Sequence, residues 1–242
     1  MHLTAPIHRL KRRARDIARA EGIALSQALD RIAVAEGFAA WSHLAATLPH
    51  PAPTLLRRFD PGDLVLIAAR PGHGKTLLAL ELAVDAVRAG RQAHVFTLDY
   101  HEAEVLARLR DLRNLGADPA SLGAGFHLDT SDDICADHIL ARLGAPGPGT
   151  VVVVDYLQIL DQKRSHPPLD AQLRTLSEGA KRLGIIVLLI SQVDRAYART
   201  GRDMPGLDDI RLPNPMDVGL LTKACFLQDG KIRFQDLAPS PA

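Results

Sequence analysis

Residues 69–76 are Ala69-Arg70-Pro71-Gly72-His73-Gly74-Lys75-Thr76, a glycine-rich stretch that contains Gly-Lys-Thr. An apolar run at 64–68 precedes it, and residues 77–83, which are apolar except for Glu81, follow it. This order of strand, tight loop and helix is the context that a phosphate-binding loop requires. Its glycines let backbone N–H groups turn toward an anion, and the next helix directs its positive N-terminal end at the same point.

The loop predicts a site for a nucleoside triphosphate, and all eight residues are candidate contacts. Lys75 is expected to reach the β- and γ-phosphates, and Thr76 to place its hydroxyl on Mg²⁺. Ala69 departs from the motif, which begins with glycine. The alternative is a glycine-rich turn that contains Gly-Lys-Thr by chance, and the flanking strand and helix patterns disfavour it.

The composition fits a globular protein with one sizeable α/β domain and a small appendage. Apolar residues make up 47% and charged residues 24% of the 242 residues. No apolar run approaches the roughly 18 residues of a membrane span, and the N-terminus lacks a signal-peptide core. The two cysteines, Cys135 and Cys225, have no metal-ligand spacing and are expected to be reduced. We therefore expect a cytoplasmic protein without a membrane partner.

Residues 1–48 are predicted to form a small basic helical domain. Apolar residues recur at helical spacing over 6–20, and two shorter helices should follow. The first 50 residues carry a net charge of +3, and the remainder carries −2. A proline-rich linker at 49–54 should separate this unit from the main domain at 55–242. The first helix carries a cluster of basic residues: Arg9, Lys11, Arg12, Arg13 and Arg15. These residues either contact nucleic-acid phosphates or form only a solvated basic face.

The main domain alternates expected strands with expected helices. Strands are predicted at 63–69, 93–98, 125–128, 150–155 and 185–192. Four consecutive valines at 151–154 indicate a strand that is buried on both faces, as in a parallel sheet. Near the end of the chain, Asp229-Gly230 separates two short strand patterns, which is typical of a β-hairpin. We predict an α/β fold with a mostly parallel sheet flanked by helices, a C-terminal β-hairpin and the N-terminal all-α unit.

Polar residues at the ends of three expected strands should converge on the phosphate loop, because such sheets bind ligands beyond the carboxyl ends of their strands. Asp155 is a candidate Mg²⁺ ligand beside Thr76, with a helix N-cap as its alternative role. Asp99 is the candidate for orienting or deprotonating an attacking water, and Glu102 is the fallback one turn later. Gln192 is the candidate for contacting the γ-phosphate or the water.

Several segments resemble, in order, the motifs of DnaB-type replicative helicases. They are Ala68-Ala69-Arg70-Pro71 with Gly74-Lys75-Thr76, then Phe96-Thr97-Leu98-Asp99, Val153-Val154-Asp155-Tyr156-Leu157-Gln158, Ile190-Ser191-Gln192-Val193-Asp194-Arg195 and Leu207-Asp208-Asp209-Ile210-Arg211. The resemblance covers roughly residues 55–228, and alanine at the Ala69 position is frequent in the family. It implies a RecA-like P-loop ATPase fold, ATP with Mg²⁺, hexameric rings and movement along single-stranded DNA.

By this resemblance, Lys75 and Thr76 bind phosphate and Mg²⁺, Asp155 is the Walker B acid and Gln192 senses the γ-phosphate. The chain departs from the family at Asp99, where glutamate is usual. Aspartate is one methylene shorter, and a misplacement near 1 Å costs on the order of a hundredfold in rate. By the same resemblance, we expect the small basic unit to take the place of the family's N-terminal dimerising domain, and the C-terminal end to be shorter.

Two further sets of basic residues have open interpretations. In the family, a neighbouring subunit supplies a Lys and an Arg with Lys-x-Arg spacing to the ATP site. Lys231 and Arg233 have this spacing. They are either such a pair or have the spacing by coincidence. Arg195, Arg199 and Arg202 lie in a segment where RecA-like proteins contact DNA, with a solvated loop as the alternative.

Two functions of different class follow from these observations. The first is a DNA-associated ATPase that resembles a helicase. The second is a nucleotide-gated interaction or regulatory module with little hydrolysis and no unwinding. A small-molecule kinase is disfavoured, because no acceptor-binding lid or arginine-rich cap is evident in the sequence.

Overall fold

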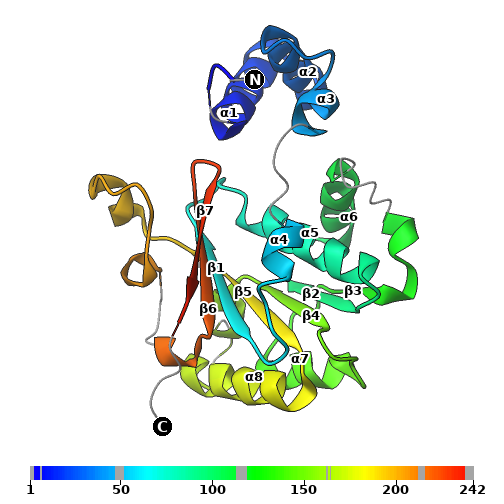
Figure 1. The fold of residues 1–242 in the computed structure, drawn as a ribbon, viewed down its shortest axis with the longest axis vertical. Coiled ribbons are helices and arrows are strands. Elements are labelled where there is room, and N and C mark those ends of the chain that lie inside the picture. The colour runs from blue at the N-terminus through cyan, green and yellow to red at the C-terminus, as the bar shows by residue number, and fades with distance from the viewer. Residues whose placement is uncertain are drawn as a thin grey trace.

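The computed structural model describes residues 3–5, 7–46, 52–112, 119–161, 163, 165–211 and 216–237. Within these residues, one seven-stranded sheet forms the centre of an α/β domain, and a small helical unit lies beyond one end of this sheet (Figure 1). No helix in these ranges is both long and apolar enough to span a membrane.

The strand order of the sheet is β3-β2-β4-β5-β1-β6-β7. Neighbouring strands run parallel except β7, which pairs antiparallel with β6. Every residue of β1, β2 and β4 is buried, as expected for strands with helices on both faces. The predicted α/β class, with a mostly parallel sheet and a C-terminal hairpin, is confirmed. The strands are β1 (Leu64–Ala69), β2 (Ala93–Thr97), β3 (Phe126–Asp129), β4 (Val151–Asp155), β5 (Ile186–Gln192), β6 (Lys223–Gln228) and β7 (Lys231–Asp236).

Helices cover the two faces of the sheet and bury alternate side chains of each strand. The core on one face contains Val65 and Ile67 with α4 (Ala52–Leu56), α5 (Lys75–Arg88) and α6 (Glu102–Asp111). The core on the other face contains Leu64 and Leu66 with α7 (Ala136–Leu143) and α8 (Leu169–Leu183). Short 3-10 turns connect these elements: η2 (Pro119–Gly125), η3 (Leu157–Asp161), η4 (Arg195–Arg199), η5 (Leu207–Asp209) and η6 (Val218–Leu220).

The N-terminal unit packs α1 (Ile7–Glu21), α2 (Leu25–Ala35) and α3 (Trp41–Ala46) around a small core of its own. Leu10 and Ile32 are buried in this core, and Trp41 packs against it.

The predicted linker differs from the structure in part. Residues 52–54, expected to be linker, belong to α4, and Ala52 is fully buried. Proline in the first turn of a helix removes only an N–H group that has no partner within that helix, so Pro53 is compatible with α4. The rest of the predicted linker lies at or beyond the edge of the described residues.

An ion-pair cluster joins β1 to β6 at the end of the sheet opposite the phosphate loop. The carboxylate of Asp63 accepts hydrogen bonds from the Asp60 backbone N–H at 2.7 Å and from the Thr222 hydroxyl at 2.8 Å. The ammonium of Lys223, which is largely buried, contacts Asp63 and lies 2.6 Å from the carboxylate of Asp60. This cluster therefore fixes the start of two neighbouring strands.

Asp63→Ala should lower the free energy of unfolding by about 3 kcal/mol, because it removes one partner of a buried ion pair and leaves the Lys223 ammonium with Asp60 alone. Urea denaturation measures the change. Asp236→Ala is the control, since Asp236 is exposed and lies 3.7 Å from Arg58, and an exposed pair should contribute less than about 1 kcal/mol. Equal losses in the two variants would contradict the structural role of the cluster.

Candidate functional site

The phosphate loop connects β1 to α5. Gly72 and Gly74 have φ angles of 82° and 88°, a left-handed conformation that favours glycine. Gly74 is the N-cap of α5, so Lys75 and Thr76 lie in the first turn of that helix. The first N–H groups of a helix have no partner within it, so the start of α5 offers them to an anion. Pro71 and Gly72 are exposed, which leaves the loop open to solvent.

Four of the predicted residues come together beside this loop. Asp155 ends β4 and is only 3% exposed, and the hydroxyl of Thr76 donates a hydrogen bond to its carboxylate. Burial raises the pKa of Asp155 to about 6, while Thr76 and Lys75 act in the opposite direction. Asp99 lies two residues beyond Thr97, the residue that pairs with Asp155 across β2 and β4.

The charges of this group depend on one another. Burial lowers the pKa of Lys75, and the carboxylates of Asp155 and Asp99 oppose that effect. Burial also raises the pKa of Asp99, and the Lys75 ammonium opposes it. The half-buried Lys75 ammonium therefore interacts with two carboxylates at the carboxyl end of the sheet, the edge at which parallel sheets bind ligands.

Thr76 and Asp155 offer oxygen ligands of the kind that Mg²⁺ prefers. No group of three or more His, Cys, Asp or Glu side chains in the described ranges is arranged to hold a metal ion. In the usual Mg²⁺ site of nucleotide enzymes, one or two protein ligands act together with substrate phosphates.

Gln192 and Glu102 occupy different positions relative to this group. Gln192 ends β5 opposite Ala69 in the register, so it lies directly beside the start of the phosphate loop. Its backbone carbonyl accepts a hydrogen bond from the Arg211 N–H at 2.7 Å, which links it to the segment after β5. Glu102 lies exposed in the first turn of α6. The structure therefore places Asp99, and not the fallback Glu102, in the group with Lys75.

The sequence interpretation missed Arg108. Its guanidinium lies over the ring of Tyr100, 4.0 Å from the centroid, and its charge lowers the pKa of Asp155. Arg108 is one of several arginines near α6, and its proximity to the site depends on the path of the chain after β2. No spacing in the sequence distinguishes it from Arg110.

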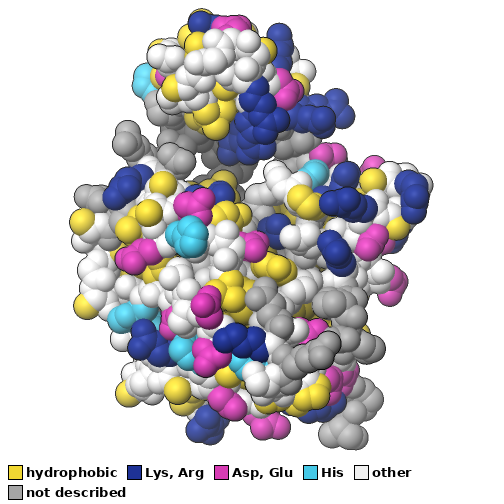
Figure 2. All heavy atoms as spheres, turned by 180° about the vertical axis from the view of Figure 1, so that it is seen from behind, with side chains coloured by type: hydrophobic (Ala, Val, Ile, Leu, Met, Phe, Trp, Pro, Cys, Tyr) yellow, Lys and Arg dark blue, Asp and Glu magenta, His cyan; other side chains and the backbone are white. Residues whose placement is uncertain are grey.

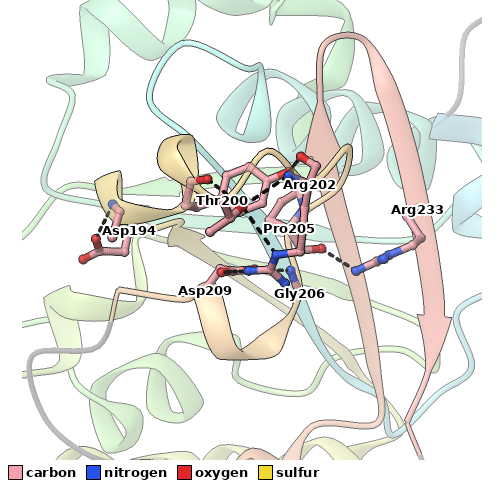
Figure 3. Close-up of polar contacts among 9 residues, drawn as sticks. Asp194, Thr200, Arg202, Pro205, Gly206, Asp209 and Arg233 are labelled. Carbon is pink, nitrogen blue, oxygen red and sulfur yellow. Dashed lines mark hydrogen bonds and ion pairs between the residues drawn. The ribbon is translucent and has the colours of Figure 1, made fainter.

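The three arginines after β5 are all exposed but differ in their contacts. Arg195 and Arg199 are exposed on η4, so part of the expected loop is a 3-10 turn. The guanidinium of Arg202 donates to the carboxylate of Asp209 (Figure 3). The Arg202 carbonyl accepts a hydrogen bond from the Tyr197 hydroxyl at 2.5 Å. Arg202 therefore holds its own segment together, whereas Arg195 and Arg199 point their charge at solvent.

The Lys-x-Arg residues lie on β7. Arg233 donates to the backbone carbonyl of Pro205 in the same chain (Figure 3). Its guanidinium lies 5.3 Å from the centroid of the Phe226 ring. Lys231 is exposed at the start of β7. In this structure Arg233 thus tethers the segment after β5 to the hairpin.

The basic residues of α1 differ in their exposure to solvent. Figure 2 shows Lys and Arg side chains gathered on the part of the helical unit that is next to the α/β domain. Lys11 is half-buried, and the other predicted residues are exposed: Arg9, Arg12, Arg13 and Arg15.

Comparison with known proteins gives consistent results. Residues 54–115 match the model of the DnaB-like helicase C terminal domain. The replicative DNA helicase DnaB of Geobacillus stearothermophilus is 25% identical over 182 residues, which cover 63% of this chain and 40% of that protein. The replicative DNA helicase DnaB of Rhodothermus marinus is 30% identical over 183 residues, covering 62% and 19% respectively. This chain thus spans two fifths or less of the length of these relatives.

Solved structures show the same fold. The structure of a DnaB-like replicative helicase described with its primase interactions matches with a TM-score of 0.59 at 22% identity, over 73% of this chain and 51% of that one. A second solved structure, of an ATPase domain, matches with a TM-score of 0.58 at 20% identity, over 73% of this chain and 74% of that one.

Proposed function

We propose that the protein binds ATP with Mg²⁺ and hydrolyses it, because the main domain of this chain is a DnaB-type helicase C-terminal domain. One observation carries this proposal. Lys75, Thr76, Asp99 and Asp155 meet at the phosphate loop, although they come from α5, from β4 and from the loop after β2.

Each residue of the group has a distinct role in the proposed reaction. The Lys75 ammonium and the N–H groups of the loop stabilise the negative charge on the β- and γ-phosphates. Thr76 and Asp155 would hold Mg²⁺, which supplies further charge neutralisation on the same phosphates. Asp99 orients the attacking water and accepts its proton. The water oxygen bonds to the γ-phosphorus as the bond to the β–γ bridging oxygen breaks, and ADP and phosphate leave.

Gln192 is proposed to detect the γ-phosphate. It lies beside Ala69 at the start of the loop, and its carbonyl is hydrogen-bonded to Arg211. Through this hydrogen bond, a movement of the Gln192 backbone would also move the segment that carries Arg195 and Arg199. We further propose that the chain assembles into a homo-oligomer, a hexamer by analogy with DnaB-type proteins.

The proposed macromolecular partner is single-stranded DNA. The exposed arginines on α1 and η4 support this proposal. Contacts to a phosphate backbone depend on long, positively charged side chains and do not need a shaped pocket. Binding of this kind releases counterions, so its strength falls steeply as salt rises.

Single-stranded DNA should stimulate ATP hydrolysis several-fold at low salt, and the stimulation should disappear as the salt concentration rises. Steady-state hydrolysis with and without an oligonucleotide measures the effect. The double variant Arg195→Ala, Arg199→Ala should reduce it, whereas Arg88→Ala, Arg110→Ala, two exposed arginines elsewhere, should not. If the chain binds ATP but DNA leaves a negligible rate unchanged, it is instead a nucleotide-gated interaction module.

A further inference from the structure

The turn of the β6–β7 hairpin contacts the phosphate loop. Asp229 and Gly230 form this turn with φ angles of 51° and 79°, the left-handed pair of a tight hairpin turn. The Asp229 backbone N–H donates to Nδ1 of His73 at 3.3 Å, and the Asp229 carboxylate lies 3.9 Å from the same nitrogen. His73 stands between Gly72 and Gly74, at the centre of the loop. A change in loop conformation therefore acts directly on the hairpin turn.

The other side of the same turn lies close to the N-terminal unit. A Cβ atom placed on Gly230 would lie 3.9 Å from Cγ2 of Ile7, which is ordinary van der Waals distance. Ile7 begins α1. The turn thus lies between the phosphate loop and the helical unit, and Figure 1 shows the tip of the hairpin directed toward α1.

A second link joins α1 to the site. Lys11 lies one turn after Ile7, so both side chains face the same side of α1. Burial raises the pKa of Glu81 to about 7, and the charge of Lys11 acts in the opposite direction. Glu81 belongs to α5, the helix that begins at Lys75. Both links from α1 therefore end on elements that form or contact the phosphate loop.

The positive charge of the helical unit would attract an anion bound at the adjoining end of the α/β domain. Lysine and arginine side chains gather where the unit is next to the α/β domain (Figure 2). A triphosphate at the loop would add negative charge close to this positive surface. Attraction between them would draw α1 onto the hairpin turn and α5, and dissociation of the nucleotide would weaken that attraction.

We propose that nucleotide binding and docking of the N-terminal helical unit stabilise each other, with the Asp229–Gly230 turn and Glu81 as the docking surface for α1. The inference rests on the proposed nucleotide binding at the phosphate loop. Because linkage is reciprocal, a unit that docks more tightly when ATP is bound also raises the affinity for ATP by the same factor.

Charge reversal at Lys11 tests the coupling in the full chain. Lys11→Glu places a carboxylate beside Glu81 and should undock α1. Lys181→Glu is the matched control, since it makes the same lysine-to-glutamate change at an exposed position of α8, on the other face of the sheet. In titrations of Mg-ATP, Lys11→Glu should bind about fivefold more weakly than Lys181→Glu, the lower range of allosteric coupling. Adding Glu81→Lys to Lys11→Glu should restore most of the affinity.

Hydrogen exchange over residues 7–21 gives a second readout. Mg-ATP should slow exchange there in the wild type and in Lys181→Glu, but not in Lys11→Glu. If Lys11→Glu and Lys181→Glu bind ATP equally well, and Mg-ATP does not change exchange in α1, the coupling is overturned and nucleotide binding still stands. A folded wild type that binds no ATP would overturn both.

Discussion

Lys75→Ala should lower kcat/KM for ATP hydrolysis by a factor on the order of 10³, because a preorganised charge on the transferring phosphate contributes 10²–10³ or more. Lys75 is held in the first turn of α5 and faces the carboxylates of Asp155 and Asp99. Its removal leaves these two carboxylates close together beside the phosphates, without the cation that balances them. Steady-state hydrolysis by the purified full chain measures the loss.

The control for this variant is Lys181→Ala, the same chemical change at an exposed position on α8. It should hydrolyse ATP at the wild-type rate. Circular dichroism of both variants separates a loss of chemistry from a loss of fold. A Lys75→Ala variant that is folded and still hydrolyses ATP within about tenfold of the wild-type rate would exclude Lys75 from the proposed role.

Asp99→Glu should raise kcat by about tenfold, since the carboxylate of Asp99 is one methylene short of the family's usual glutamate and small misplacements of a base are costly. The backbone at Asp99 is held by a hydrogen bond from its N–H to the Thr97 hydroxyl at 3.2 Å. The added methylene should therefore extend the carboxylate toward the water without moving the loop. Single-turnover hydrolysis compares the chemical step directly.

Asp99→Asn is the companion variant, because it keeps the size of the side chain and removes its basicity. It should reduce turnover below that of the wild type. If Asp99→Glu is slower than the wild type, the site is built for aspartate, and the short side chain is not what limits hydrolysis. Equal rates in all three proteins would show that Asp99 takes no part in the reaction.

The parts of this fold that follow from local pattern were predictable. The valine run at 151–154 is β4, buried throughout, because only a strand inside a parallel sheet needs apolar residues on both faces. Asp155 and Gln192 end strands whose carboxyl ends share one edge of the sheet, so their convergence on the phosphate loop followed from strand direction alone.

The parts that depend on tertiary contacts were not predictable. The sequence could not show that Arg202 would bind Asp209 while Arg195 stayed exposed, because the pairing depends on how the segment after β5 folds back. The proline-rich stretch predicted a linker, yet α4 begins within it and packs on the sheet. The contact between the hairpin turn and His73 depends on the pairing of β6 with β1, which no local signal encodes.

The most direct test of the central claim is calorimetric titration of Mg-ATP into the full chain and into Asp155→Asn. The account predicts saturable binding with one site per chain, and at least tenfold weaker binding of Mg-ATP in the variant, because the buried carboxylate that would hold Mg²⁺ is gone. A folded wild type that shows no binding at millimolar Mg-ATP, or a variant that binds as tightly as the wild type, would contradict it.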